Sequence, residues 1–329
     1  MAGTLVLATI GRDGLTRNAL ELLGGAVKLR AKLAEPVGAA VLGNALGSRA
    51  QLPFAYGADQ VYLAEHPLLE PYQGDAFAIA LHEICQRAQP KLILLPGDSM
   101  GRELAPRLAH RLGAGFVTEF IDLEIDPSSG PFLFTRQVYG GKAMAMVQAV
   151  ASPVVATAKL RMIEPATREE GRTGEAVRID VVLEASQLKT RLLEKVQEEL
   201  TGVKLEDARI VVSGGRGLRG PEGFKVLEEL AQVLKGAVGA SRAATDTGWV
   251  SPSWQVGQTG KSVSPDLYLA FGISGATQHV AGISGAKTIV AINTDPEAPI
   301  YKVAQLGVVA DWKAVATKLI ESCREMTGQ

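Results

Sequence analysis

The residues with the clearest chemical potential form a glycine-rich turn in the second half of the chain. Gly215-x-Gly217-x-x-Gly220 follows a β-branched run and precedes a helical pattern, which is the context of a dinucleotide-binding turn. Glycines there let backbone N–H groups approach a pyrophosphate at a helix N-terminus. Two details depart from that pattern. Pro221 suits the first helical position and so places Gly220 before the helix, and no acidic residue follows about 20 residues later. The turn therefore predicts either a nucleotide-phosphate site or a purely structural turn.

Further polar segments of the same half fall at strand-to-helix turns or in loops. They read GASRAATDTGWV (239–250), QVGQTGK (255–261) and GISGATQH (272–279), and the strand-like run 288–293 precedes NTDPEAPIY. A doubly wound sheet binds ligands at such turns. Their hydroxyls, glycine-flanked amides, arginine, histidine and asparagine suit a long ligand that contains a pyrophosphate. An NADP-dependent dehydrogenase that uses Arg242 on a 2′-phosphate is a second interpretation of these residues.

The segments before residue 125 alternate short β-branched runs with helical patterns. This alternation predicts βαβ units, which form a mainly parallel sheet with helices on both faces. The expected strands are Thr4–Ile10, Val37–Gly43, Gln60–Glu65 and Lys91–Pro96, and the expected helices are Thr16–Leu33, Ala45–Tyr56 and Asp75–Gln89.

The alternation of strand and helix patterns stops after residue 125, where three strand-like runs follow one another without a helix. Gly140-Gly141 suits a hairpin turn between the first two, so we expect a locally antiparallel extension. The charged stretch Glu164–Glu175 lacks an apolar period and predicts a loop. The three runs are Phe132–Tyr139, Lys142–Val150 and Val154–Leu160.

A domain boundary is expected near residue 200. Ser186–Leu200 has a helical pattern, and Thr201-Gly202 is a suitable stop. The chain then restarts with a strand at Ala208–Ser213 and a helix at Pro221–Leu234. We therefore expect an α/β fold with two domains, residues 1–200 and 201–329, each with a mainly parallel doubly wound sheet. The break at Thr201–Lys204 suggests a hinge between them.

Composition excludes several classes of protein. Lys plus Arg number 34 and Asp plus Glu number 35, a net charge of −1, which argues against a basic nucleic-acid binder. Cys85 and Cys323 form neither a metal-binding pattern nor a disulfide framework, which fits a reducing compartment. The N-terminus lacks a signal-peptide pattern, and the uncharged stretch between Lys142 and Lys159 is shorter than the roughly 18 residues of a membrane span. We expect a soluble, cytoplasmic protein without membrane insertion.

Five motifs in fixed order make a family resemblance specific. SGGRGL, GASRAATDTGW, QVGQTGK, GISGATQH and AINTDPEAPI resemble the FAD-binding domain of the electron transfer flavoprotein alpha subunit. LLPGDSMGRELAPRLAHRLG resembles that family's first domain, which has a nucleotide-hydrolase-like fold, so the likeness spans the chain. Thr294 is a departure, since relatives often carry Lys there, but Asn293 and Asp295 are kept. A second GISGA copy at 282–286 is interpreted as a turn only.

The resemblance implies a site for FAD and a role for individual residues. Arg242 would lie against the flavin ring, Thr259 would hydrogen-bond to its N5, and His279 would lie near its O2 edge. The ribityl chain, pyrophosphate and adenosine would be held by Gly215, Arg216, Ser241, Gln255, Gln258, Ser274, Asn293 and Asp311, and Gly257, Gly275 and Gln278 complete the expected FAD-binding set.

Structural roles for some of these residues stay open. Arg242 could form an ion pair with Asp246, Thr259 could close a turn between neighbouring glycines, and His279 could sit beside a helix N-terminus. Trp249 and Trp254 are predicted to pack in the core or at a domain interface rather than on the flavin.

The resemblance also implies partners. The family is a heterodimer with a beta subunit that holds AMP. It accepts electrons from acyl-CoA dehydrogenases in fatty acid β-oxidation and from related flavoenzymes, and passes them to a membrane-bound quinone oxidoreductase. The sequence contains no nucleophile elbow, carboxylate pair or metal cluster in a glycine-rich context, which favours a single-electron carrier over an enzyme. The alternatives are an NADP-dependent oxidoreductase and a redox-inactive nucleotide-binding regulatory protein.

Overall fold

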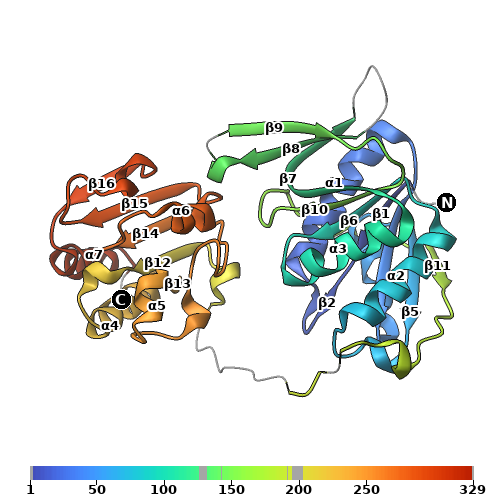
Figure 1. Ribbon diagram of the computed structural model, residues 1–329, viewed down its shortest axis with the longest axis horizontal. Coiled ribbons are helices and arrows are strands. Elements are labelled where there is room, and N and C mark those ends of the chain that lie inside the picture. The colour runs from blue at the N-terminus through green and yellow to red at the C-terminus, as the bar shows by residue number, and fades with distance from the viewer. Residues whose placement is uncertain (1–2, 126–131, 142, 191, 195–202, 328–329) are drawn as a thin grey trace. The chain divides into compact units, whose positions relative to one another are not determined.

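The chain folds into two compact units, each with its own mainly parallel sheet (Figure 1). Unit 1 comprises Met1–Val138 and Lys142–Val196, and unit 2 comprises Tyr139–Gly141 and Gln197–Gln329. The computed structural model describes residues 3–125, 132–141, 143–190, 192–194 and 203–327. The expected α/β class is confirmed in both units.

The described residues of unit 1 form a nine-stranded sheet with the order β11-β5-β4-β1-β6-β10-β7-β8-β9. Its strands pair in parallel except at β7–β8 and β8–β9, which are antiparallel. The strands are β1 (Thr4–Leu7), β4 (Val37–Gly43), β5 (Gln60–Glu65), β6 (Leu92–Pro96), β7 (Gly115–Ile125), β8 (Phe132–Val138), β9 (Ala143–Gln148), β10 (Val154–Ala158) and β11 (Glu175–Arg178), and β2 (Ile10–Gly11) pairs with β3 (Gly14–Leu15) in a separate hairpin.

Helices cover both faces of this sheet. Val6 of β1 packs with α1 on one face, and Leu5 and Leu7 pack with α2 and α3 on the other, as the two-residue period of a strand requires. Thr16 caps α1 by accepting the Ala19 N–H, and Asp98 caps α3 in the same way. The helices are α1 (Arg17–Leu33), α2 (Gly74–Ala88) and α3 (Ser99–Leu112), with 3₁₀ turns η1 (Gly47–Tyr56), η2 (Pro67–Leu69), η3 (Tyr139–Gly141) and η4 (Ala185–Gln187).

Three sequence predictions for unit 1 were wrong in part. Val154–Ala158 does not extend the antiparallel hairpin but inserts in parallel between β6 and β7. The expected helix at Ala45–Tyr56 is the 3₁₀ segment η1. Of the expected helix at Ser186–Leu200, residues 186–190 and 192–194 contain only the η4 turn. The rest of that helix and the predicted stop at Thr201-Gly202 lie outside the described residues.

The charged stretch after β10 is irregular, as predicted, but it is anchored to the unit. The Ala166 N–H donates to the carbonyl of Leu20 at 2.8 Å, and the Glu169 N–H donates to that of Ala55 at 2.7 Å. A Cβ on Gly24 of α1 would lie 2.2 Å from the backbone carbonyl oxygen of Glu164. The stretch therefore packs directly on the backbone of α1.

Unit 2 has a five-stranded parallel sheet in its described residues, with the order β13-β12-β14-β15-β16. Apolar clusters fill both faces, and Trp249 and Trp254 pack against one of them, which confirms core packing for both side chains. The elements are β12 (Ile210–Gly214), β13 (Ala237–Ala240), β14 (Leu267–Phe271), β15 (Thr288–Asn293), β16 (Leu306–Val309), α4 (Glu222–Val233), α5 (Arg242–Asp246), α6 (Thr277–Ile283), α7 (Trp312–Thr327), η5 (Leu205–Asp207), η6 (Arg216–Leu218), η7 (Pro252–Trp254) and η8 (Pro299–Lys302).

The strand order places a topological switch point in each unit. In unit 2 the chain runs from β12 to β13 on one side and then crosses to β14 on the other. In unit 1 the same reversal separates β1 from β6. Open α/β sheets bind ligands outside the carboxyl ends of the strands at such points.

Neither cysteine forms a disulfide, and burial raises the pKa of the Cys85 thiol to about 12. Within the described residues, no three His, Cys, Asp or Glu side chains come together as a metal site. None of the described helices combines the length and the apolar character needed to cross a membrane.

Candidate functional site

Most of the predicted binding residues surround a cavity at the carboxyl edge of the unit 2 sheet. Its volume is about 770 Å³, which is typical of a site for a small molecule or cofactor. The walls come from the loops after β12, β13, β14 and β15 and from the segment between η7 and β14. Because these strands are parallel, their carboxyl ends meet at one edge, and the cavity lies at the switch point.

Eleven of the fourteen predicted residues line this cavity. Gly215 and Gly275 are buried in its loops without lining it, and Asp311 lies at the start of α7, where its Oδ1 accepts the Lys313 N–H at 2.9 Å. The lining residues are Arg216, Ser241, Arg242, Gln255, Gly257, Gln258, Thr259, Ser274, Gln278, His279 and Asn293.

Glycines bring the two central loops of the cavity into direct backbone contact. The Gly215 N–H donates to the carbonyl of Phe271, and the Gly217 N–H to that of Gly272, both at 2.9 Å. A Cβ on Gly217 would lie 2.7 Å from the Gly272 Cα, and Gly272 has a φ of +60°. Glycine is therefore required here by the packing of one loop on the other.

Two similar contacts hold the remaining loops. A Cβ on Gly282 would lie 2.4 Å from the Cα of Gly257, and a Cβ on Gly275 would lie 2.3 Å from the Ile300 nitrogen. Gly282 opens the second GISGA copy, which the sequence predicted to be only a turn. That prediction was wrong for its first two residues, since Gly282 and Ile283 belong to α6.

Some backbone N–H groups of the described cavity wall lack acceptors. No side chain caps α4, α5 or α6. The N–H groups of Arg242 and Ala243, in the first turn after β13, make no hydrogen bond within the described residues. Unpaired N–H groups of this kind attract the oxygens of an anion such as phosphate.

Three arginines, Arg216, Arg219 and Arg242, give the lining its positive charge. Arg242 Nε lies 3.2 Å from Asp246 Oδ2, with 68% and 61% of the two side chains exposed. The ion pair left open from the sequence therefore exists, but an exposed pair of this kind contributes little to stability. Arg216 and Arg219 form no ion pair within the part of the chain that the structure describes.

A hydrogen-bonded row of side chains leads to Thr259. The buried Thr245 hydroxyl donates to Gln255 Oε1 at 2.8 Å, and Gln255 Nε2 donates to Thr259 Oγ1 at 3.1 Å. Since Thr259 Oγ1 accepts from Gln255, its own hydroxyl proton is available to the cavity. The turn named as the alternative also exists, since the Gly260 N–H donates to the Gly257 carbonyl at 3.1 Å, across Thr259.

His279 lines the cavity but is almost fully buried, with 6% of its surface exposed. Its Nε2 lies 2.9 Å from the hydroxyl of Tyr268, a fully buried residue of β14. Its Nδ1 is also buried and has no hydrogen-bond partner within the described residues. Burial lowers the pKa of His279 to about 4, with partial opposition from the backbone of Val256, so the imidazole is neutral at pH 7.

Asn293 ties the end of β15 to the neighbouring loop. Its Nδ2 donates to the carbonyl of Ile273 at 3.1 Å, and its Oδ1 accepts the Asp295 N–H at 3.0 Å. The Tyr301 hydroxyl lies 3.1 Å from the Asn293 nitrogen and 2.9 Å from its carbonyl oxygen. Asn293 thus helps to shape the wall that it lines.

The cavity also contains residues that the sequence predictions did not include. Arg219 follows η6 with a φ of 64° and lies in the same turn as Arg216. Its place in that turn could have predicted that it lines the cavity. Apolar residues also line the cavity and make part of its surface hydrophobic, and the sequence motifs gave no indication of this. The added lining residues are Gly217, Arg219, Ala243, Asp246, Val256, Ile273, Ala276, Thr294, Asp295 and Ala298.

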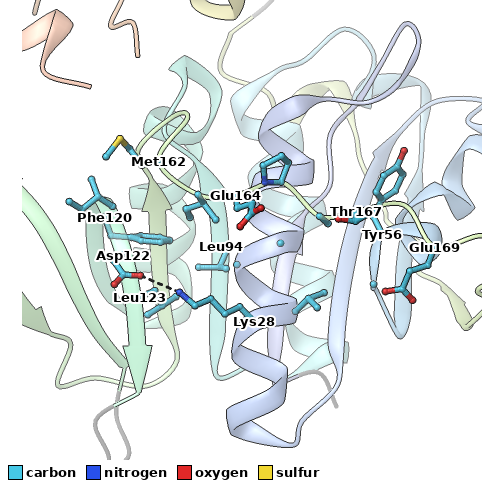
Figure 2. Close-up of a pocket in the computed structure, with 18 residues that line it drawn as sticks. Lys28, Tyr56, Leu94, Phe120, Asp122, Leu123, Met162, Glu164, Thr167 and Glu169 are labelled. Atoms are coloured by element: carbon cyan, nitrogen blue, oxygen red, sulfur yellow. Dashed lines mark ion pairs between the residues drawn. The ribbon is translucent and has the colours of Figure 1, made fainter. Parts of the chain in front are cut away.

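A second cavity of about 660 Å³ lies in unit 1 (Figure 2). It is bounded by α1, β7 and the anchored stretch 162–169, and it flanks the middle of α1. Lys28 Nζ and Asp122 Oδ1 are 3.9 Å apart, and Glu164 and Glu169 add negative charge. With one lysine against three carboxylates in its described lining, this cavity is a poor anion site.

Comparison with known proteins assigns the family. The electron transfer flavoprotein domain matches residues 4–184, and the electron transfer flavoprotein FAD-binding domain matches residues 204–284. The chain is 42% identical to the electron transfer flavoprotein subunit alpha of Thermoanaerobacterium thermosaccharolyticum over 317 residues, covering 96% of each chain. It is 40% identical to that of Bacillus subtilis over 322 residues, covering 98% of this chain and 97% of the relative.

The chain belongs to the electron transfer flavoprotein alpha-subunit family. The family resemblance drawn from the motifs is thereby confirmed, and unit 2 contains the family's FAD-binding domain. The described residues fit the dinucleotide on chemical grounds. Arginines and unpaired N–H groups suit a pyrophosphate, apolar residues suit a ring, and the buried Nδ1 of His279 lacks the partner that a ligand could supply.

Proposed function

We propose that this chain is the FAD-binding subunit of a heterodimeric electron carrier and has no catalytic reaction of its own. The observation that carries the proposal is the cavity at the unit 2 switch point, where cationic side chains and unpaired N–H groups converge beside His279. Membership of the electron transfer flavoprotein alpha-subunit family supports the same assignment.

The two halves of the dinucleotide suit different parts of the lining. Arg216 and Arg219 of the β12 loop and the N–H groups of the β13 loop suit the pyrophosphate. Arg242, Thr259 and His279 suit the polar edge of the flavin. When bound, FAD supplies a ring that takes up and releases electrons one at a time.

Arg242 provides the positive charge that stabilises added negative charge on a ring beside it. At about 4 Å and an effective dielectric constant near 20, one unit charge contributes about 4 kcal/mol. Asp246, 3.2 Å away, opposes this field, and the exposure of both side chains weakens it further. Thr259 adds a neutral donor, which contributes about 1 kcal/mol.

The ionisable groups of the lining do not form an acid–base pair. Asp246 is committed to Arg242, and His279 is neutral and hydrogen-bonded to Tyr268. Asp295 accepts the Glu297 N–H in an exposed turn. This arrangement supports electron transfer rather than proton abstraction from a substrate.

The proposal extends to organisation and partners. Residues 1–200 form an N-terminal domain that contacts a beta subunit holding AMP, and residues 201–329 form the FAD-binding domain. Acyl-CoA dehydrogenases and related flavoenzymes donate the electrons, and a membrane-bound quinone oxidoreductase accepts them. We assign the protein to the cytoplasm, which agrees with the absence of a disulfide at Cys85 and Cys323.

The test is the cofactor of the purified complex. The full chain, produced together with its beta subunit, is expected to show a flavin absorption band and to release one FAD per heterodimer on denaturation. A redox titration is expected to show one-electron steps. A colourless complex that cannot be reconstituted with FAD would overturn the assignment, and release of NADP would select the oxidoreductase alternative.

A further inference from the structure

The proposed function assigns a role to His279 but none to Tyr268, the residue to which it is hydrogen-bonded. Tyr268 is fully buried in β14, four residues before Gly272, the first residue of the loop that borders the cavity. Its hydroxyl lies 2.9 Å from Nε2 of His279, and the two rings are tilted by 59° with centroids 6.1 Å apart. A tyrosine hydroxyl deep in a sheet needs such a partner.

We propose that Tyr268 is a positioning residue that fixes the tautomer of His279. Its hydroxyl donates to Nε2, so the imidazole proton resides on Nδ1. The inference rests on the proposed function only in its last step, where Nδ1–H serves as a donor to an acceptor oxygen of the bound cofactor.

The direction of this hydrogen bond follows from the chemistry of the two groups. A phenol is the stronger hydrogen-bond donor and an unprotonated imidazole nitrogen the stronger acceptor, so the O–H···N arrangement is preferred. Desolvation raises the pKa of Tyr268, against a smaller opposing effect of the Ser213 hydroxyl, and so keeps the tyrosine protonated. A serine hydroxyl that lowers this pKa donates to the tyrosine oxygen, which leaves the tyrosine proton for Nε2. Desolvation lowers the pKa of His279 to about 4, which keeps the ring neutral. In a neutral histidine, the bond made by one nitrogen decides where the proton resides on the other.

Nδ1 is the ring atom left for a ligand. It is buried and makes no hydrogen bond of full geometry within the described residues, although His279 lines the cavity and the Val256 backbone lies near enough to the ring to raise its pKa. A buried donor without an acceptor is unfavourable, so a ligand oxygen that accepts from it gains affinity. Without Tyr268, the proton could move to Nε2, and Nδ1 would become an acceptor that repels a ligand oxygen.

The first experiment reads the tautomer directly. The full chain with its beta subunit, stripped of FAD and labelled with ¹⁵N-histidine, is examined by nitrogen NMR, and His279→Asn identifies the His279 signals. We expect Nδ1 protonated and Nε2 unprotonated. His66 is an internal reference with the opposite tautomer, because its Nδ1 accepts the Leu68 N–H at 3.1 Å. A proton on Nε2 of His279 would overturn the proposal.

The second experiment removes only the hydroxyl. Tyr268→Phe is expected to give a mixture of His279 tautomers and to raise the Kd for FAD about 5–10-fold. Tyr62→Phe is the matched control, since Tyr62 is 3% exposed and its hydroxyl bonds to Gln60 at 2.8 Å in unit 1. It is expected to leave both measurements unchanged.

The outcomes separate this inference from the proposed function. Loss of FAD binding in the unmodified protein and in Tyr62→Phe would refute the proposed function, whereas the tautomer can still be read without FAD. Normal FAD binding with an unaltered tautomer and Kd in Tyr268→Phe would refute only the role of Tyr268. If Tyr268→Phe unfolds, the tautomer of the unmodified protein still decides the proposal.

Discussion

The two units share a switch-point topology but treat the helices at that point differently. In unit 1 the helices that follow β1 and β6 are capped by their own side chains, Thr16 and Asp98. Thr9 bonds to Thr16 at 2.6 Å, and Asn18 donates to Asp98 at 3.0 Å, so the polar groups of this edge satisfy one another. In unit 2 neither α4 nor α6 has a side-chain cap.

This difference shows why the switch point of unit 2 suits an anion better than the switch point of unit 1. A side chain that caps a helix occupies the N–H groups that an anion would otherwise use. Asp98 also places a negative charge where a phosphate would bind. Unit 2 omits both and adds Arg216 and Arg219 to the corresponding loop.

The largest effect is expected from crowding the two glycine loops of unit 2. In Gly217→Ala the new methyl group meets the backbone of Gly272 at 2.7 Å, and neither loop can retreat without losing hydrogen bonds. We expect a loss of about 2–3 kcal/mol in the free energy of unfolding of unit 2 and at least a tenfold weaker FAD affinity. All three tryptophans lie in unit 2, so tryptophan fluorescence during denaturation measures this unit.

Gly220→Ala is the matched control for that variant. It lies in the same loop, but nothing is within 4 Å of its Cβ position. It is expected to change stability by less than about 0.5 kcal/mol. Equal losses in the two variants would show that glycine is needed for backbone freedom and not for loop contact.

A pH effect should also separate the two units. The folded pKa of His279 is about 4, lowered by burial, while an unfolded histidine titrates near 6.5. Between these values the unfolded chain binds the additional proton, so the free energy of unfolding falls as the pH drops from about 6.5 to about 4, by about 3 kcal/mol at most. Tryptophan fluorescence of the FAD-free protein during acid titration measures this loss.

His279→Asn should flatten this acid profile. His110→Asn changes an exposed histidine of unit 1 and should leave it unaltered. A profile that keeps its slope in His279→Asn would assign the loss to other groups.

The charges beside the cavity should shift the flavin potential in opposite directions. Arg242→Ala is expected to lower the midpoint potential and Asp246→Asn to raise it, each by tens of millivolts. The upper limit is about 170 mV, from about 4 kcal/mol at 59 mV per 1.4 kcal/mol for one electron. Redox titration of the heterodimer measures both shifts.

Glu222→Gln is the control for the charge variants, because Glu222 forms an exposed ion pair with Lys225 on α4, at 2.9 Å. Its potential should match that of the unmodified protein. Shifts of the same sign in Arg242→Ala and Asp246→Asn would exclude a direct effect of these charges on the ring.

The sequence predicted the strands and the loops that follow them better than the contacts between loops. Val37–Gly43, Gln60–Glu65 and Thr288–Asn293 are strands with the predicted bounds. Parallel strands bring the loops that follow them to one edge, so motifs far apart in sequence could be placed together. The contact of Gly217 with Gly272 was not predictable from the sequence. A glycine that lets a ligand approach the backbone and a glycine that lets another loop approach it occur in the same sequence pattern.

Other errors have identifiable physical causes. Glu175–Arg178 is a mostly exposed edge strand, and its polar residues gave no hydrophobic signal. Val154–Ala158 pairs with strands distant in sequence, and adjacency along the chain does not reveal such pairing. A helical period such as that of residues 186–190 and 192–194 needs an apolar surface to pack on before it forms a helix.

The smallest effect on stability is expected from adding a cap to unit 2. Ala276 is exposed at the position before α6 and lines the cavity. In Ala276→Asp the carboxylate can accept an N–H of the first turn, which should stabilise FAD-free unit 2 by about 0.5–1 kcal/mol. The same carboxylate should weaken FAD binding by about tenfold, more at low salt than at high salt. Thermal unfolding and FAD titration measure the two effects.

Asp98→Ala makes the reciprocal change in unit 1. It removes the acceptor of the Gly101 N–H and the partner of Asn18, and should cost about 1 kcal/mol of unit 1 stability without altering the Kd for FAD. If Ala276→Asp stabilises the FAD-free protein but binds FAD normally, the N–H groups at α6 are not part of the cofactor site. The difference in helix capping between the units would then concern stability alone, and the arginines of the β12 loop would account for binding of the pyrophosphate.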